Sequence, residues 1–294
     1  ELHKRIVQSL QHHSYEVIYV NDCSTDGSWK VISEICQNHN HVSAINFRKN
    51  FGQDNALMSG IHHANGRYIV IMDDDLQHDP GDIPKLFNRC TEGYDVCYAR
   101  FNHLEQSLWK RLGSNVNNMV ANILLKKPRH IYMSAFKMIK AEVAKDILRY
   151  TGPFPYVDGL LLHTTSNLTE IDAVHHKRYK GNGNYTFIRS LAVTIRLTTN
   201  SSVRLLRIAT FSGFAIAFLG FALAVYYLIE YFTINKTIEG WTSLIITNLI
   251  IGGVMLAALG IVGEYLGRVF FFMNRNPQYS ISEKINGQDT APVN

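Results

Sequence analysis

The first hundred residues alternate between short apolar runs and longer stretches in which apolar residues recur at helical spacing. Polar, turn-forming residues end each apolar run, as is typical of strands. The pattern predicts strands at Glu16–Asn21, Val42–Phe47, Tyr68–Met72 and Asp95–Ala99, and helices at Glu1–Leu10, around Trp29–Cys36, at Ala56–Ala64 and at Ile83–Arg89. This alternation predicts an α/β domain with a doubly wound, mostly parallel sheet, in which ligands bind beyond the carboxyl ends of the strands.

Beyond residue 200 the pattern changes to two long stretches without charge. Ile208–Ile229 contains 22 residues and Gly240–Gly263 contains 24. A helix needs ~20 residues to cross the hydrocarbon core of a bilayer, so we predict two transmembrane helices. The alternative is a pair of very apolar helices in the core of a soluble protein.

Basic residues flank both predicted spans on the same side. Arg204 and Arg207 precede the first span, and Arg268 and Arg275 follow the second. The positive-inside rule therefore places both flanks in the cytoplasm. We expect a cytoplasmic globular domain over residues 1–184, an amphipathic juxtamembrane segment over 185–206, the two-helix membrane region over 207–268 and a cytoplasmic tail over 269–294. No signal peptide is recognisable, and we expect the true start to lie upstream.

Composition excludes several classes of protein. Charged residues make up 18% of the chain, below the globular average of roughly 25%, which excludes a disordered chain and agrees with a membrane region. The net charge of +5 is too small to indicate a nucleic-acid partner. The four cysteines show no zinc-binding spacing, which favours thiols in a reducing compartment.

Two acidic segments follow predicted strands. Asp22 lies in VNDCSTDGS, and Asp73 opens DDDLQHDP. Adjacent carboxylates repel one another, so their clustering favours a bound cation or a donor-rich ligand. We expect Asp73, Asp75 and Gln77 to share one side of an extended segment and to bind Mg²⁺ or Mn²⁺. The alternative is a solvated acidic turn.

A basic region separates the globular domain from the first span. No acidic residue occurs from Ala173 to Ile229, whereas seven basic residues do: Lys177, Arg178, Lys180, Arg189, Arg196, Arg204 and Arg207. This pattern predicts contact with anionic lipid headgroups. Arg178 lies more than 25 residues before the span, so we favour a phosphate ligand over an ordinary flanking charge.

Four motifs carry a resemblance to a known family. VNDCSTDGS, NFGQDNALMSG and MDDDLQHDP resemble, in this order, three segments of family 2 glycosyltransferases of the GT-A fold. The C-terminal GEYLGRVF and NRNPQY resemble the signature of the membrane-bound branch that acts on polyisoprenyl phosphates. That branch includes bactoprenol glucosyltransferases, undecaprenyl-phosphate aminoarabinose transferases and dolichyl-phosphate mannose synthases.

The resemblance implies a GT-A catalytic domain and an inverting transfer of sugar from a nucleotide sugar to undecaprenyl phosphate at the bacterial inner membrane. The expected donor is UDP-glucose, followed by UDP-linked amino sugars, and the lipid-linked product would serve O-antigen or lipopolysaccharide modification. The implied residues are Asp75 and Arg178 for catalysis; Asp22, Asn50, Asp73 and Asp74 for the nucleotide sugar; Asp73, Asp75 and Gln77 for the metal; and Arg100, Arg111, Lys137 and Arg178 for the acceptor phosphate.

The chain departs from the family pattern at three places, and at the first of them Asn21 and Cys23 stand where Asp and Gly are usual. The usual opening strand that ends in P-x-Y-N-E is missing, and Gly183 and Asn184 stand where Ser and Lys are usual. An inactive relative or a membrane scaffold is therefore one alternative. A processive polysaccharide synthase is another, but it would ordinarily carry Q-x-x-R-W, and no Arg-Trp pair occurs here.

Small residues recur along both predicted spans, which permits close approach of helices. They are Gly213, Ala217, Gly220, Gly252, Ala257 and Gly260. Enzymes of the resembled branch form homo-oligomers, so we expect a homo-oligomer, with a tetramer as its size. The alternative is a monomer in which these residues pack the two spans together.

Overall fold

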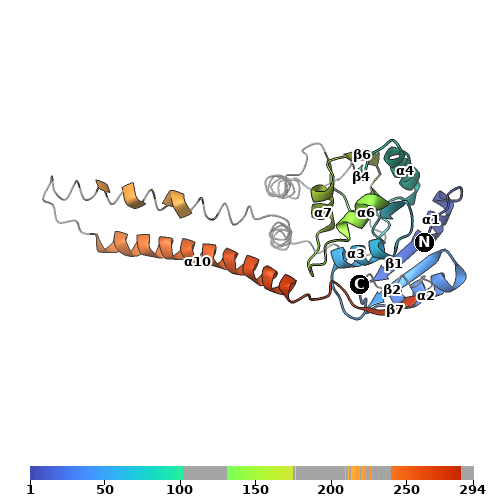
Figure 1. Cartoon of the computed structure of the whole chain (residues 1–294), viewed down its shortest axis with the longest axis horizontal. Coiled ribbons are helices and arrows are strands. Elements are labelled where there is room, and N and C mark those ends of the chain that lie inside the picture. Colours follow the sequence, from blue (N-terminus) through green and yellow to red (C-terminus); the bar gives the residue numbers. More distant parts are fainter. Residues whose placement is uncertain are drawn as a thin grey trace. The chain divides into compact units, whose positions relative to one another are not determined.

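The computed structural model describes residues 1–101, 131–174, 176 and 240–285, together with scattered residues between 209 and 233. The chain divides into two compact units (Figure 1). The first unit combines residues 1–200 with 275–294, and the second comprises residues 201–274.

The eight elements predicted in the first hundred residues are confirmed, with bounds that shift by a few residues. They are α1 (Leu2–Ser9), β1 (Val17–Asn21), α2 (Ser28–Asn38), β2 (Val42–Phe47), α3 (Gln53–His63), β3 (Tyr68–Ile71), α4 (Ile83–Thr91) and β4 (Val96–Phe101). A short 3₁₀ helix, η1 (Pro80–Asp82), lies between β3 and α4.

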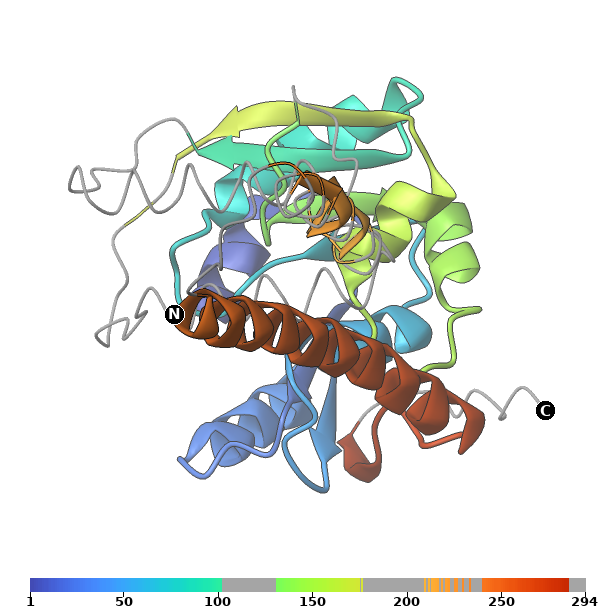
Figure 2. The same cartoon turned by 90° about the vertical axis from the view of Figure 1, so that its left-hand side faces the viewer.

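Five further elements were not predicted: β5 (Lys137–Lys140), α6 (Ala141–Ile147), α7 (Val157–Thr164), β6 (Leu168–Ala173) and β7 (Ile281–Ile285). The described strands form two sheets, with the orders β1-β2-β7 and β3-β5-β4-β6. Figure 2 shows β4 and β6 running side by side.

The prediction of a mostly parallel sheet is wrong, because both described sheets are mixed. The β1–β2 and β4–β6 pairs are parallel, whereas the β2–β7, β3–β5 and β4–β5 pairs are antiparallel. The causes are β7, which pairs with β2, and β5, which inserts between β3 and β4. The strand β5 gives little sequence signal. Its sequence, KMIK, has a lysine at each end and is too short to give a strand pattern.

Alternate residues of β4 and β5 pack on opposite faces of their sheet, as the period of a strand requires. Tyr98 and Ile139 pack on one face with residues of α6 and α7. Cys97 and Met138 pack on the other face with residues of α4. The sheet is therefore buried between two helical layers, and the loops at its ends remain to carry polar groups.

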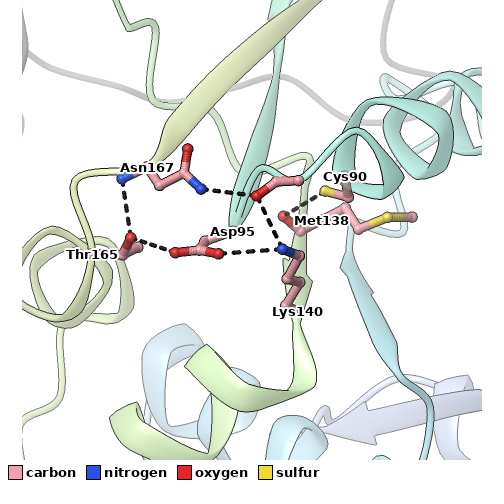
Figure 3. Close-up of polar contacts among 7 residues, drawn as sticks. Cys90, Asp95, Met138, Lys140, Thr165 and Asn167 are labelled. Atoms are coloured by element: carbon pink, nitrogen blue, oxygen red, sulfur yellow. Dashed lines mark hydrogen bonds and ion pairs between the residues drawn. The ribbon is translucent and has the colours of Figure 1, made fainter.

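A polar network fixes the end of the sheet at which β4 begins (Figure 3). Lys140 Nζ donates to Gly93 O at 3.0 Å and lies 3.4 Å from Asp95 Oδ1. Thr165 Oγ1 donates to Asp95 Oδ2 at 2.7 Å, and Asn167 Nδ2 donates to Gly93 O at 2.9 Å. These bonds join the loops that precede β4 and β6 to the end of β5, so the three strands are held in register.

The segment after residue 274 returns to the first unit and adds β7 along the edge of β2 (Figure 1). Trp29 Nε1 donates to Glu283 Oε2 at 3.0 Å, and the ring of Tyr279 stacks on Phe47 with centroids 5.2 Å apart. Residues 269–294 were expected to form a cytoplasmic tail, and a strand within them was not predicted. Because β7 covers the edge of β2, that edge has no unpaired backbone for other chains to join.

Replacing Tyr279 by alanine should lower the free energy of unfolding by roughly 2–3 kcal/mol, because the variant loses buried apolar area and an aromatic pair. Tyr279→Phe keeps the stacked ring and serves as the matched control, with little change expected. Thermal unfolding of the purified chain in detergent measures both variants. Equal stability of the two variants would show that the stacking on Phe47 does not hold the C-terminal segment.

The second unit contains α10 (Trp241–Met273), which is labelled in Figure 1. From its 33 residues the helix is about 50 Å long. Its segment Ile250–Met273 has a mean hydropathy of 1.8, and among the described residues this is the one helix long and apolar enough to cross a membrane. The helix continues ten residues beyond the predicted second span. Arg268 Nη2 lies 2.6 Å from Glu264 Oε1, one helical turn earlier.

The predicted first span lies largely outside the described residues, which include only a shorter apolar helix over Gly213–Ala222. Two transmembrane helices therefore stay a prediction.

Candidate active site

The acidic segment after β1 folds against the start of α3. Asp22 Oδ1 accepts a hydrogen bond from Phe51 N at 2.7 Å, and Asp22 Oδ2 accepts one from Gly52 N at 2.8 Å. Asn50 Nδ2 donates to the carbonyl oxygen of Asp22 at 3.3 Å. Gly52, with φ of +92°, adopts a backbone conformation that favours glycine. Asp22 and Asn50 thus fix the loop that enters α3, where the helix dipole favours a carboxylate.

Replacing Asp22 by alanine should lower the free energy of unfolding by about 1–2 kcal/mol, because two backbone N–H groups lose their acceptor. Hydrogen exchange should accelerate at Phe51 and Gly52. Asp26 accepts from Ser28 N at 3.0 Å, so Asp26→Ala is a matched control that should affect α2 and leave this loop unchanged. Unchanged exchange at Phe51 and Gly52 in Asp22→Ala would contradict the assigned role.

The acidic segment after β3 forms a tight turn. The chain bends over residues 74–76, and Leu76 is buried with φ of +61°. Asp75 Oδ1 accepts from Gln77 N at 3.1 Å, and Asp73 N donates to His78 Nδ1 at 3.1 Å. The expected extended segment is therefore wrong: burial of Leu76 turns the chain, so the spacing of Asp73, Asp75 and Gln77 does not set their common direction.

His78 holds this turn from the buried side of the chain. The imidazole is buried and stacks on Phe101 and Phe136, with centroid separations of 5.5 and 5.3 Å. Because Nδ1 accepts the N–H of Asp73, the proton of a neutral His78 lies on Nε2. Sequence reasoning missed this residue, since its role depends on aromatic partners far away in the sequence.

The two acidic segments meet through the loop before α3. Gln53 Nε2 donates to Asp73 Oδ1 at 3.0 Å, one residue beyond the Gly52 amide that Asp22 holds. Both acidic segments therefore contact the loop that enters α3. Burial raises the pKa of Asp73, and the nearby carboxylates of Asp75 and Asp74 raise it further, while His78 and Lys137 oppose the rise.

The donor set suits a hard divalent cation. Carboxylates that are partly buried and close together destabilise one another when ionised, and a cation relieves that repulsion. Asp73 and Asp75 are half-buried, Asp74 is exposed, and their ligand atoms are all oxygens. Gln77 contributes its backbone to the turn through Asp75.

Lys137 lies inside the domain next to this cluster. Its side chain is 2% exposed, forms an ion pair with Asp158 in the first turn of α7, and lies 5.4 Å from the centroid of the Tyr98 ring. Tyr98 Oη also donates to Asp158 Oδ1 at 3.0 Å. This placement does not support the expected contact of Lys137 with an acceptor phosphate, because the ammonium already has a buried partner.

Asp54 and Asp158, which sequence reasoning missed, extend the acidic cluster around Lys137. Asp54 Oδ1 accepts from Val157 N at 3.0 Å and so ties α3 to the start of α7. Burial raises the pKa of Asp54, and Asp158 adds to the rise, while the Val157 N–H and Lys137 oppose it. No local pattern in the sequence distinguishes these two carboxylates from surface ones.

Of the three remaining candidates for binding the acceptor phosphate, the structure describes only Arg100. Arg100 is 52% exposed and pairs with Glu170 at 2.8 Å. Arg111 and Arg178 lie outside the described residues. His176, two residues before Arg178, donates its backbone N–H to Gln77 O at 3.0 Å.

The side chain of His176 also reaches the acidic segment, where Nε2 lies 3.3 Å from Asp79 Oδ2. The N–H of Gly81 lowers the pKa of Asp79, and His176 contributes to the decrease. The chain that follows β6 is thus attached to the acidic turn at two points.

Comparison with known proteins identifies relatives over most of the chain. Residues 2–148 match the model of the family described as Glycosyl transferase family 2. An undecaprenyl-phosphate 4-deoxy-4-formamido-L-arabinose transferase from Photorhabdus laumondii is 29% identical over 94% of this chain and 86% of that protein. A glycosyltransferase from Bacillus subtilis, YkcC, is 28% identical over 92% of this chain and 84% of that protein.

Among solved structures, glucosyl-3-phosphoglycerate synthase from Mycobacterium tuberculosis, in complex with phosphoglyceric acid, is similar over 67% of this chain and 72% of that chain. The TM-score is 0.47 and the sequence identity is 17%.

Proposed function

Because the chain belongs to glycosyl transferase family 2, we propose that its acidic site transfers one sugar from a nucleotide-diphosphate sugar to a polyprenyl phosphate. The observation that carries the proposal is that both acidic segments contact the loop that enters α3. Asp22 binds the N–H of Gly52, and Asp73 binds the side chain of Gln53, the next residue. The relatives named as undecaprenyl-phosphate transferases support undecaprenyl phosphate as the acceptor.

The proposed chemistry follows from charge. An acceptor phosphate is anionic at neutral pH, so its oxygen can attack the anomeric carbon without a strong general base. The new C–O bond forms as the bond from that carbon to the nucleotide diphosphate breaks, and the diphosphate leaves with the electron pair. Direct displacement of this kind inverts the configuration at the anomeric carbon.

The carboxylates of Asp73 and Asp75, with Gln77 beside them, would hold Mg²⁺ or Mn²⁺. Such a cation supplies positive charge that stabilises the departing diphosphate. Asp22 and Asn50 act by fixing the loop that carries Gln53, and Asp74 remains a candidate for direct contact with the nucleotide sugar.

Arg178 is the proposed ligand of the acceptor phosphate. One residue separates it from His176, so the two Cα atoms lie at most about 7 Å apart. Since His176 is hydrogen-bonded to Gln77, the chain length supports a place for Arg178 beside the acidic turn. Arg100 and Arg111 are secondary candidates.

The proposed donor is a UDP-sugar. The names of the relatives favour a 4-deoxy-4-formamido-L-arabinose donor, and UDP-glucose is the second candidate. Either product would be a lipid-linked sugar for modification of O-antigen or lipopolysaccharide.

We place the protein in the bacterial inner membrane, with its catalytic domain in the cytoplasm and two spans. The apolar length of α10 supports one of these spans. A homotetramer is the proposed assembly. In the described part of the chain, a Cβ added at Gly252 or Gly260 would meet no atom within 4 Å, which leaves these positions accessible to a neighbouring helix.

Incubation of membranes that contain the protein with radiolabelled UDP-sugars tests the proposal. Label should enter an organic-extractable lipid. Label in a long polymer would favour a processive synthase, and no label from any donor would favour a membrane scaffold.

A further inference from the structure

Three histidines far from the acidic turn in sequence come together in the first unit. His3 lies on α1, and His39 and His41 lie in the turn between α2 and β2. The ring centroid of His3 is 4.6 Å from that of His39 and 6.1 Å from that of His41. One ring nitrogen from each residue lies within 4.8 Å of those of the other two.

The backbone around these rings is fixed. His39 O accepts from Val42 N at 3.0 Å, and His41 O accepts from Val17 N at 2.9 Å. The turn is therefore bonded to the start of both β1 and β2. A turn held in this way presents its two imidazoles to α1 at little further entropic cost.

Two of the ring nitrogens are buried without a partner. Nε2 of His3 and Nε2 of His41 have no hydrogen bond, although both atoms are inaccessible to solvent, and His3 as a whole is 8% exposed. A buried polar atom without a partner destabilises the fold, because its lost contact with water is not replaced. Two such atoms on neighbouring rings favour a ligand that both could bind.

The other nitrogen of His3 is oriented as in a metal site. Nδ1 lies 3.3 Å from Tyr19 Oη. The phenol oxygen can accept the Nδ1–H. Metal-bound histidines almost always donate their second ring N–H to such a partner, which directs the first nitrogen at the ion.

We infer that His3, His39 and His41 form a binding site for a divalent transition metal of the Zn²⁺ class, separate from the acidic site. Imidazole nitrogens suit Zn²⁺, Co²⁺ and Ni²⁺ and are poor ligands for Mg²⁺. Zinc–nitrogen bonds of about 2.0–2.1 Å require the three nitrogens to approach one another by an ångström or so. Among the described residues no fourth histidine, cysteine or carboxylate joins the group, so water completes the tetrahedron.

The site would join α1 to the α2–β2 turn. Helix α1 also packs against η1, which directly follows the acidic turn at residues 73–77. Bound metal would therefore stabilise the position of α1 and, through η1, the end of the acidic turn. This role differs from that of the cation at Asp73 and Asp75, and each can be lost without the other.

Equilibrium dialysis of the purified full chain against Zn²⁺, with excess Mg²⁺ present, tests the site. We expect about one zinc per chain for the native protein and for Asp75→Ala. His39→Ala removes a half-buried ligand with the least risk to folding and should weaken binding by at least about 100-fold, and Tyr19→Phe by roughly 10-fold. The exposed His12 provides the matched control His12→Ala, which should bind as the native chain does.

Cobalt gives a second readout. Co²⁺ should give the visible absorption of a tetrahedral nitrogen site with the native chain and not with His39→Ala. Zn²⁺ should raise the melting temperature of the native chain and leave that of His39→Ala unchanged. Equal zinc binding by the native chain and His39→Ala, or no zinc binding by either, would overturn the site and leave the three rings as a packing cluster.

Discussion

Replacing Asp75 by alanine should lower the rate of sugar transfer by roughly 10³-fold or more, because the departing diphosphate loses its main source of charge stabilisation. The turn itself should persist, because the side chains of Leu76 and His78 remain buried in the domain. The measurement is transfer of label to lipid by purified protein, with Mg²⁺ and with Mn²⁺.

Asp146→Asn is the matched control for this variant. Asp146 is exposed on α6 and pairs with Arg149, so the change removes one carboxylate of the same kind outside the site. Both variants should insert into membranes as the native chain does. Near-normal turnover of Asp75→Ala with either cation would exclude the metal assignment.

Replacing Lys137 by methionine should lower the free energy of unfolding by about 3 kcal/mol, because Asp158 loses its buried counter-charge. Asp158→Asn should be at least as destabilising, since it leaves an ammonium group that is 2% exposed without a charged partner. A loss of this size corresponds to a decrease of roughly 6–12 °C in melting temperature, which near-UV circular dichroism in detergent can follow.

The double variant distinguishes this ion pair from simple packing. Lys137→Met combined with Asp158→Asn should lose less stability than the sum of the single changes, with a coupling of at least ~1 kcal/mol. Arg149→Met removes an exposed ion pair and should leave the melting temperature unchanged. Additive effects of the two buried changes would contradict a direct interaction.

Local patterns predicted the first half of the domain well. The apolar runs of β1, β2, β3 and β4 are long enough to identify strands, and the helices between them have regular spacing. The same patterns failed for β5 and β7, whose sequences KMIK and ISEKI are short and carry charges. Those two strands form only because long-range pairing supplies their neighbours, and together they change the expected parallel sheet into mixed sheets.

The candidate site was predicted in composition but not in geometry. The acidic residues after β1 and β3 were identified, and Gln53, which follows the loop that Asp22 holds, contacts Asp73. Sequence could not show that Asp22 bonds to backbone amides or that Lys137 is buried against Asp158, because both roles depend on residues brought together by folding.

The most direct test of the proposed function is mass spectrometry of the lipid formed by the purified protein from undecaprenyl phosphate and a panel of UDP-sugars. We predict one product, undecaprenyl phosphate that carries a single sugar, formed by the native chain and absent with Asp75→Ala. Failure of every donor to give this lipid, or a lipid that carries a polymer of sugars, would contradict the account.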